Sequence, residues 1–259
     1  MAGDEIFTYR DGIAAAQVVA FSAPLLFAIY FKYTRRIGWF CIDVFSLLRL
    51  VSASCKLAAI DNGSRGLSAA IFVCEPLGMI LIIFLLLEML ERINKVFSII
   101  LKRMFWIPSI ITCDIGISIG GWVSVTHAEH QLAPTPWSQA SMALVAVIYL
   151  YLVRNFILFW LHKAEYLEEE RWALAGVAFC VPLLAERVTY YLMFVITSNM
   201  AFNAIKGNPT AYLIMTMLPE VVIITACTSI IATRVSPLVK ARKKLQENTE
   251  DEESQRRPS

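Results

Sequence analysis

Residues 67–87 read LSAAIFVCEPLGMILIIFLLL, an apolar run with a single ionisable residue, Glu75. A helix that crosses a lipid bilayer needs about 20 mainly apolar residues. This run has that length, and it could extend to Leu90. It therefore predicts a membrane-spanning helix with one carboxyl group at membrane depth.

The rest of the chain repeats this pattern. Seven apolar runs each predict a spanning helix, at residues 13–31, 39–60, 67–87, 105–123, 140–160, 172–197 and 212–232. We therefore expect an all-α, seven-transmembrane-helix bundle over residues 1–233, followed by a disordered cytoplasmic tail at 234–259. We expect no cleavable signal peptide, because the N-terminal segment is acidic and the first run is long enough to span.

Composition excludes several classes of protein. Of the 259 residues, 58% are hydrophobic and 17% are charged, whereas a soluble domain is about 25% charged. This argues against a soluble globular enzyme, and it rules out a disordered chain, which needs low hydrophobicity. The net charge of +2 argues against a nucleic-acid partner, which would need a concentrated basic face.

Lysine and arginine residues predict the orientation, because cytoplasmic loops are enriched in both. Sixteen of them fall in the segments that are inside if the N-terminus is outside, and three fall in the outer segments. We therefore expect a lumenal or external N-terminus and a cytoplasmic C-terminus. With no sorting signal recognised, the endoplasmic reticulum membrane is the default location.

Charged residues inside the predicted spans carry the functional information. There are nine of them: Asp43, Arg49, Lys56, Glu75, Asp114, Arg154, Glu186, Arg187 and Glu220. Each costs about 2.5–3.5 kcal/mol at a helix centre on insertion scales. We therefore expect them to face one another or a wet cavity, and residues from five helices converge near one layer of the bilayer.

Prolines and tyrosines accompany these charges. Glu75 precedes Pro76 and Glu220 follows Pro219, and a proline kink opens space for a ligand or water. Tyr190 and Tyr191 each lie four residues after a charged residue of the same span, and Tyr151 lies about one turn before Arg154. These faces are expected to point inward.

Other motifs predict no additional chemistry. The six cysteines have no zinc spacing, so we expect buried free thiols. His127, Glu129 and His130 lack further ligands, so no metal is expected. Asn62 begins a glycosylation sequon close to the membrane. The inner loop at residues 91–104 is expected to contain an amphipathic stretch on the membrane surface (Val96, Phe97, Ile99, Ile100 and Leu101). Glu168–Glu170 is expected to be a solvated inner loop.

The N-terminal third carries the pattern Tyr9-Arg10-Asp11-Gly12-Ile13, then Gln17, Gly38-Trp39 and Arg49. It resembles fungal seven-helix membrane proteins that are grouped as a domain of unknown function. In size, span count and buried acids the chain is also similar to fungal membrane-bound terpene and meroterpenoid cyclases. It lacks their Asn-x-x-Trp-Glu run, and its nearest counterpart is Cys74-Glu75-Pro76.

The cyclase resemblance implies the leading hypothesis, an isomerase- or lyase-type enzyme of secondary metabolism. Its buried carboxylic acids would protonate an epoxide or olefin of a prenylated substrate, because desolvation favours the protonated acid. Glu75 and Glu220 are the proposed proton donor and partner carboxylate, with Asp114 or Glu186 as alternatives. No cofactor is required.

The substrate-binding residues of this hypothesis are basic or aromatic. Arg49 and Arg187 would set the protonation of the acids or hold a polar head, and Tyr151, Tyr190 and Tyr191 would stabilise a cation. The partners would be a lipophilic small molecule and the bilayer. Two alternatives stay open: a receptor-like or carrier protein that binds an ion, lipid or small solute, and a purely structural membrane protein.

Overall fold

The computed structural model describes residues 9–60, 65–97, 116–117, 119–120, 134–166, 168–198, 202 and 207–234. In these residues every regular element is a helix, which confirms the all-α class. The long helices are α1 (Tyr9–Tyr33), α2 (Trp39–Ala58), α3 (Arg65–Phe97), α5 (Pro136–Leu161), α6 (Glu168–Thr197) and α8 (Leu218–Thr233). A short turn, η2 (Lys163–Glu165), precedes α6, and α7 (Pro209–Tyr212) joins α8 through the π-helical turn η4 (Leu213–Met217).

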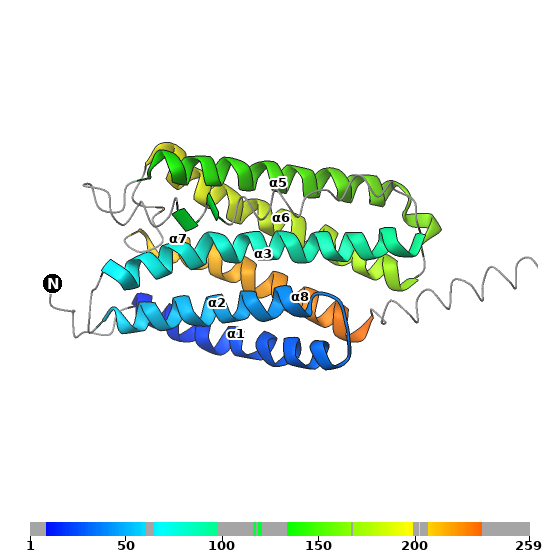
Figure 1. The fold of residues 1–259 in the computed structure, drawn as a ribbon, viewed down its shortest axis with the longest axis horizontal. Coiled ribbons are helices and arrows are strands. Elements are labelled where there is room, and N and C mark those ends of the chain that lie inside the picture. The colour runs from blue at the N-terminus through cyan, green and yellow to red at the C-terminus, as the bar shows by residue number, and fades with distance from the viewer. Residues whose placement is uncertain are drawn as a thin grey trace, which may run out of the picture.

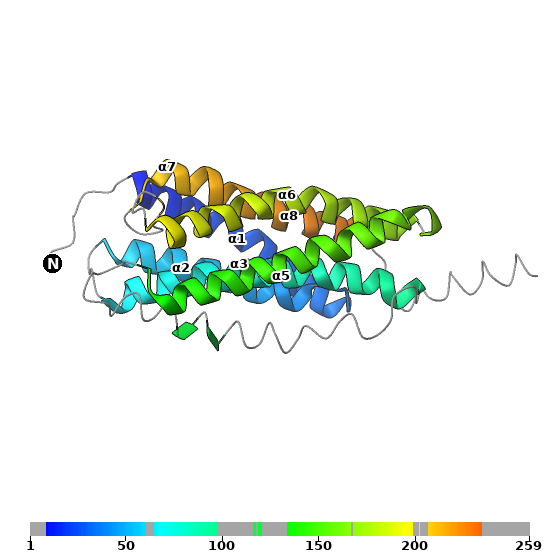
Figure 2. The same cartoon turned by 90° about the horizontal axis from the view of Figure 1, so that it is seen from above.

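The helices form an elongated bundle (Figures 1 and 2). Helix α2 packs on α1 and α3, whereas α5 packs on α3 and α6, and α8 packs on α6 and α1. Figure 1 shows α3 and α5 running in the same direction, although they are consecutive long helices among the residues described. The C-terminal end of α3 and the N-terminal end of α5 therefore lie at opposite ends of the bundle.

Five of the described helices are long and apolar enough to cross a membrane, as in a multi-pass membrane protein. They are α1, α5, the greater part of α3, the greater part of α6, and the continuous helix Pro209–Thr233. Helix α2 is not among them, because its 20 residues include Asp43, Arg49 and Lys56. The predicted span at 105–123 and the tail after residue 234 lie almost wholly outside the described residues.

Helix α3 is longer than the apolar run predicted. It continues through residue 97, so the inner loop expected from residue 91 onward is wrong for residues 91–97, while the rest of that loop lies outside the described residues. The reason is that Arg92 is buried and its Nε donates to Glu170 Oε1 over 3.0 Å. Glu170 is also buried, so the prediction that it belongs to a solvated loop is wrong too.

Three tryptophans lie at one end of the bundle, each beneath a basic side chain. Lys32 Nζ lies 5.4 Å from the ring centroid of Trp39, and Lys163 Nζ lies 4.4 Å from that of Trp160. Arg234 Cζ lies 4.8 Å from the ring of Trp172. Aromatic rings and basic residues gather where a bilayer meets water, so this end has the character of a membrane interface.

Gly38 closes the turn between α1 and α2. Its φ is 73°, a left-handed conformation that glycine adopts without strain. A Cβ atom here would lie 2.6 Å from Leu85 Cδ1, and the Gly38 amide donates to Glu88 Oε1 over 3.1 Å. The Gly38-Trp39 pair therefore marks a close contact between this turn and α3.

Candidate functional site: a buried charged cluster

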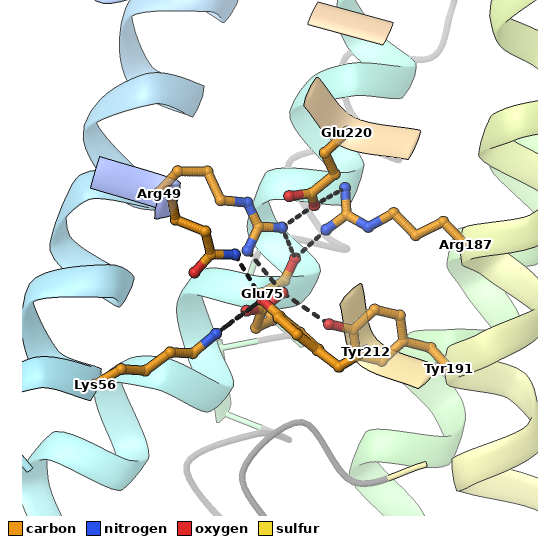
Figure 3. Close-up of polar contacts among 8 residues, drawn as sticks. Arg49, Lys56, Glu75, Arg187, Tyr191, Tyr212 and Glu220 are labelled. Atoms are coloured by element: carbon orange, nitrogen blue, oxygen red, sulfur yellow. Dashed lines mark hydrogen bonds and ion pairs between the residues drawn. The ribbon is translucent and has the colours of Figure 1, made fainter. Parts of the chain in front are cut away.

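Seven polar side chains from five helices meet inside the bundle (Figure 3). We call them the charged cluster: Arg49 and Lys56 of α2, Glu75 of α3, Arg187 and Tyr191 of α6, Tyr212 of α7, and Glu220 of α8. The arginine and glutamate side chains are at most 1% exposed, and that of Lys56 is 10% exposed. The cluster is therefore almost completely removed from solvent.

Glu75 lies at the centre of the cluster. Its Oε2 pairs with Arg49 Nη1 at 2.6 Å and accepts a hydrogen bond from the Tyr191 hydroxyl at 2.8 Å. Its Oε1 pairs with Lys56 Nζ at 3.0 Å and accepts from the Tyr212 hydroxyl at 2.6 Å. Each carboxylate oxygen thus receives one cation and one hydroxyl, an arrangement that stabilises the ionised form.

Glu220 is bound differently. Its Oε1 forms ion pairs with both Arg49 and Arg187. Its Oε2 is buried and has no hydrogen-bond partner among the residues that the structure describes. The two carboxylates are therefore not equivalent, because only Glu220 keeps a free oxygen.

Gly78 gives Arg49 its place against α3. A Cβ atom at this position would lie 2.9 Å from Arg49 Nη2 and 3.2 Å from Arg49 Cζ. Gly78 is one turn after Glu75 on the same helix. The absence of a side chain therefore lets the guanidinium group lie on the helix surface beside the carboxylate that it pairs with.

The π-helical turn η4 brings Tyr212 to the cluster. It ends at Met217, two residues before Pro219, which has no amide hydrogen to continue the helical pattern. A π-helical turn contains one extra residue. Tyr212 and Glu220 therefore face the same side, although eight residues of regular α-helix would turn them apart by about 80°.

A further set of residues surrounds Tyr212 and Lys56. The Tyr212 hydroxyl accepts from Gln17 Nε2 at 3.0 Å and from Lys56 Nζ at 2.8 Å. Tyr190 is fully buried, and its ring contacts those of Tyr191 and Phe202 edge-on. The Tyr190 hydroxyl has no hydrogen-bond partner among the described residues.

Five of the residues singled out in the sequence meet in this cluster. They are Glu75, Glu220, Arg49, Arg187 and Tyr191, and Tyr190 lies beside them. Sequence reasoning did not place Tyr212 or Gln17 in the site. Lys56 was among the nine charges expected to face one another, and it lies seven residues after Arg49 on the same helical face, but it was given no binding or catalytic role.

Other expected members lie elsewhere. Glu186 precedes Arg187, so it points about 100° away from the cluster, and it is partly exposed. Tyr151 is on α5, where it packs against the apolar core. Arg154 is exposed, so the expectation that every charge within a span faces the interior is wrong for this residue, while Asp114 lies outside the described residues.

No group of three or more potential metal ligands occurs in the part of the chain that the structure describes. The described cysteines are free, and Cys41, Cys74, Cys180 and Cys227 are buried, as expected. Asn62, Cys113, His127 and His130 lie outside the described residues.

One family model matches the chain, over residues 7–234, and it is described as a domain of unknown function (DUF7702). No curated protein and no solved structure matches the chain.

Proposed function

Because the chain belongs to the DUF7702 family, whose function is unknown, we propose a function from the geometry of the charged cluster. The protein is a receptor-like or carrier-like membrane protein that binds the polar group of a lipophilic small molecule inside its helix bundle. The observation that carries this proposal is that Glu75 and Glu220 form ion pairs with Arg49, Lys56 and Arg187 inside the bundle, since such a cluster offers polar groups that a ligand can bind.

The energy of the cluster supports a binding role over a structural one. Five ionisable side chains are placed where each costs about 2.5–3.5 kcal/mol on insertion scales. Replacing a buried ion pair by apolar side chains of similar volume is often neutral or stabilising. A cluster that only joined helices would therefore gain nothing from its charges, whereas a ligand with a polar head requires such donors and acceptors.

The exposure of the cluster supports access from one end of the bundle. Lys56 is the most exposed charged member and lies in the last turn of α2, next to the end where α1 begins. Arg10 lies at the same end, where it donates to the carbonyl of Gly207. A ligand would enter here, with its apolar part among the helices.

The proposal includes seven membrane crossings, with the N-terminus outside and the C-terminus in the cytoplasm. The parallel directions of α3 and α5 support a further crossing between them (Figure 1). Helix α2 is compatible with a crossing because Arg49 and Lys56 are paired inside the bundle. The endoplasmic reticulum membrane remains the proposed location.

Mass spectrometry of the purified protein tests the binding function. The full chain is purified from its native membrane in an uncharged detergent, and bound small molecules are extracted and compared between variants. We expect the wild type to retain a lipophilic compound that the double variant Tyr191→Phe, Tyr212→Phe loses. The control is Tyr149→Phe, because this hydroxyl donates to the Val181 carbonyl outside the cluster. Equal extracts from all three proteins would contradict the proposal.

A second function, acid-catalysed cyclisation, is favoured by one observation, the free Oε2 of Glu220. This oxygen could hold a proton and transfer it to an epoxide or olefin, while Arg49 and Arg187 stabilise the carboxylate that results. Glu75 is the weaker donor, since both of its oxygens accept from cations and hydroxyls. Tyr190 and Tyr191 would then face the developing cation.

A microsomal assay on prenylated epoxides tests the cyclase. We expect Glu220→Gln to abolish formation of the cyclic product, while Tyr149→Phe retains it. Normal turnover by a well-expressed Glu220→Gln variant would remove Glu220 as the proton donor. If the wild type turns over no epoxide but retains a ligand, the binding function stands alone.

A further inference from the structure

The charged cluster contains more cations than carboxylates. Arg49, Lys56 and Arg187 face Glu75 and Glu220. When all five are ionised, one positive charge is left without a counter-charge in a site that is removed from solvent. Such a charge is costly to bury, so one additional negative charge would neutralise the cluster.

The neighbouring ionisable residues that the structure describes do not supply that charge. Arg10, a further cation, lies within electrostatic range of Tyr190, Tyr212 and Asp11. Asp11 thus offsets Arg10. Asp43 and Glu186 are partly exposed and form no ion pair with the three cations among the residues described. Within the described residues, the surplus is therefore a property of the cluster itself.

The surplus is located on the side of Lys56. Arg49 contacts both carboxylates, and Arg187 contacts Glu220 and the backbone carbonyl of Glu75. Lys56 shares Glu75 with Arg49, and its other polar contacts among the described residues are with the Tyr212 hydroxyl and ring. Its ammonium group has three donor hydrogens, so one remains for a ligand.

Tyr190, which lies beside the cluster, provides an independent observation. Its hydroxyl is buried without a hydrogen-bond partner among the described residues. It lies within electrostatic range of Glu75, Tyr212 and Arg10. A buried hydroxyl that lacks a partner costs free energy, and a ligand oxygen would supply that partner.

We propose that the polar group bound by the cluster is a single carboxylate of a lipophilic acid. Lys56 supplies its counter-charge and the Tyr190 hydroxyl a hydrogen bond. This inference rests on the proposed binding function and specifies its ligand class. The ligand carries one negative charge because the cluster has one surplus positive charge. The rest of the ligand is apolar because the helices around the cluster are apolar.

Thermal unfolding of the full chain in uncharged detergent tests the proposal, with decanoate, decanol and decylamine as probes below their micellar concentrations. We expect decanoate to raise the Tm more than decanol, and decylamine to have no effect. Acetate and chloride are the matched free anions, and we expect them to raise the Tm less than decanoate at equal concentration.

Variants locate the site. We expect Lys56→Gln to abolish the preference for decanoate over decanol, because it removes the surplus charge. The control Lys163→Gln removes an exposed lysine at the opposite end and should keep the preference. Tyr190→Phe should weaken decanoate binding about tenfold, the loss of one hydrogen bond to a charged group. It provides the same readout if Lys56→Gln does not fold.

The outcomes separate this inference from the proposed function. If decanol and decanoate raise the Tm equally, the binding function stands and the carboxylate is wrong. If acetate or chloride matches decanoate, a free anion occupies the site and the lipophilic acid is wrong. If the Tm of the wild type shows no preference for decanoate over decanol but that of Asp114→Asn does, then Asp114 supplies the missing counter-charge. If no probe binds and purified wild type retains no compound, the binding function fails as well.

Discussion

At the scale of single residues, Gly78 leaves the space beside α3 that the Arg49 guanidinium of the charged cluster occupies. We predict that Gly78→Ala lowers the free energy of unfolding by about 1–3 kcal/mol, as overpacking does. The added Cβ would lie 2.9 Å from Arg49 Nη2, and this guanidinium is held by two carboxylates. The measurement is the Tm of the purified variant, together with its retained small molecules.

Gly176→Ala is the matched control for that experiment. Its Cβ would lie 2.5 Å from Ile230 Cδ1, the end of a flexible side chain that can rotate away. Both changes replace a glycine within a helix, so both gain roughly 0.5–1 kcal/mol in helix propensity. Equal Tm values for the two variants would contradict the idea that Arg49 is fixed in place.

The buried pair of Arg92 and Glu170 predicts a different pattern. We expect Glu170→Met alone to destabilise the protein by about 3–5 kcal/mol, because it leaves the Arg92 charge buried without its partner. The double variant Arg92→Met, Glu170→Met should recover most of that loss, as apolar replacements of buried ion pairs do. Denaturant unfolding of the two single variants and the double variant measures the coupling. Additive losses would show that the pair is not coupled.

At the scale of helices and turns, the connection between α1 and α2 depends on Gly38. We predict that Gly38→Ala destabilises the protein by about 1–3 kcal/mol, because alanine is strained at a φ of 73° and its Cβ would meet Leu85. Thermal unfolding measures the loss. The same Tm as the wild type would mean that this turn can adopt another conformation.

Long apolar runs were the part of the fold that the sequence predicted well. They located α1, α5, α6 and the last helix, because about 20 apolar residues have few alternatives to a helix in a bilayer. They did not predict the extension of α3, since Arg92 and Asn94 resemble the end of a span until Glu170 is known to pair with Arg92. A pairing between residues far apart in the sequence leaves no local pattern.

The candidate site was predictable to the same degree. Charges within apolar runs indicated Arg49, Glu75, Arg187 and Glu220, because each is costly unless paired. Tyr212 was missed since the π-helical turn η4 changes which residues share a face, and no α-helical spacing includes that change. Arg154 was expected to face the interior but is exposed, because a long side chain can reach the membrane surface.

At the scale of the whole molecule, the direction of each helix predicts which loops share a side of the membrane. Single cysteines are introduced into a cysteine-free background at Thr34, Ala164 and Asn208 and labelled in sealed vesicles. We expect Thr34 and Ala164 to be labelled from the cytoplasmic side and Asn208 from the other. Labelling of Thr34 and Ala164 from opposite sides would exclude the seven-crossing arrangement.

The contacts between α3 and α6 have a consequence for motion. Glu75 and Arg92 are seventeen positions apart on α3, as are Arg187 and Glu170 on α6, which corresponds to about 25 Å along each helix. The two helices are thus joined at both points, by the hydrogen bond from Arg187 to the Glu75 carbonyl and by the ion pair between Arg92 and Glu170. If one helix slid along the other, both interactions would break together. α3 and α6 therefore act as a rigid frame, and any opening of the bundle falls to the helices around them.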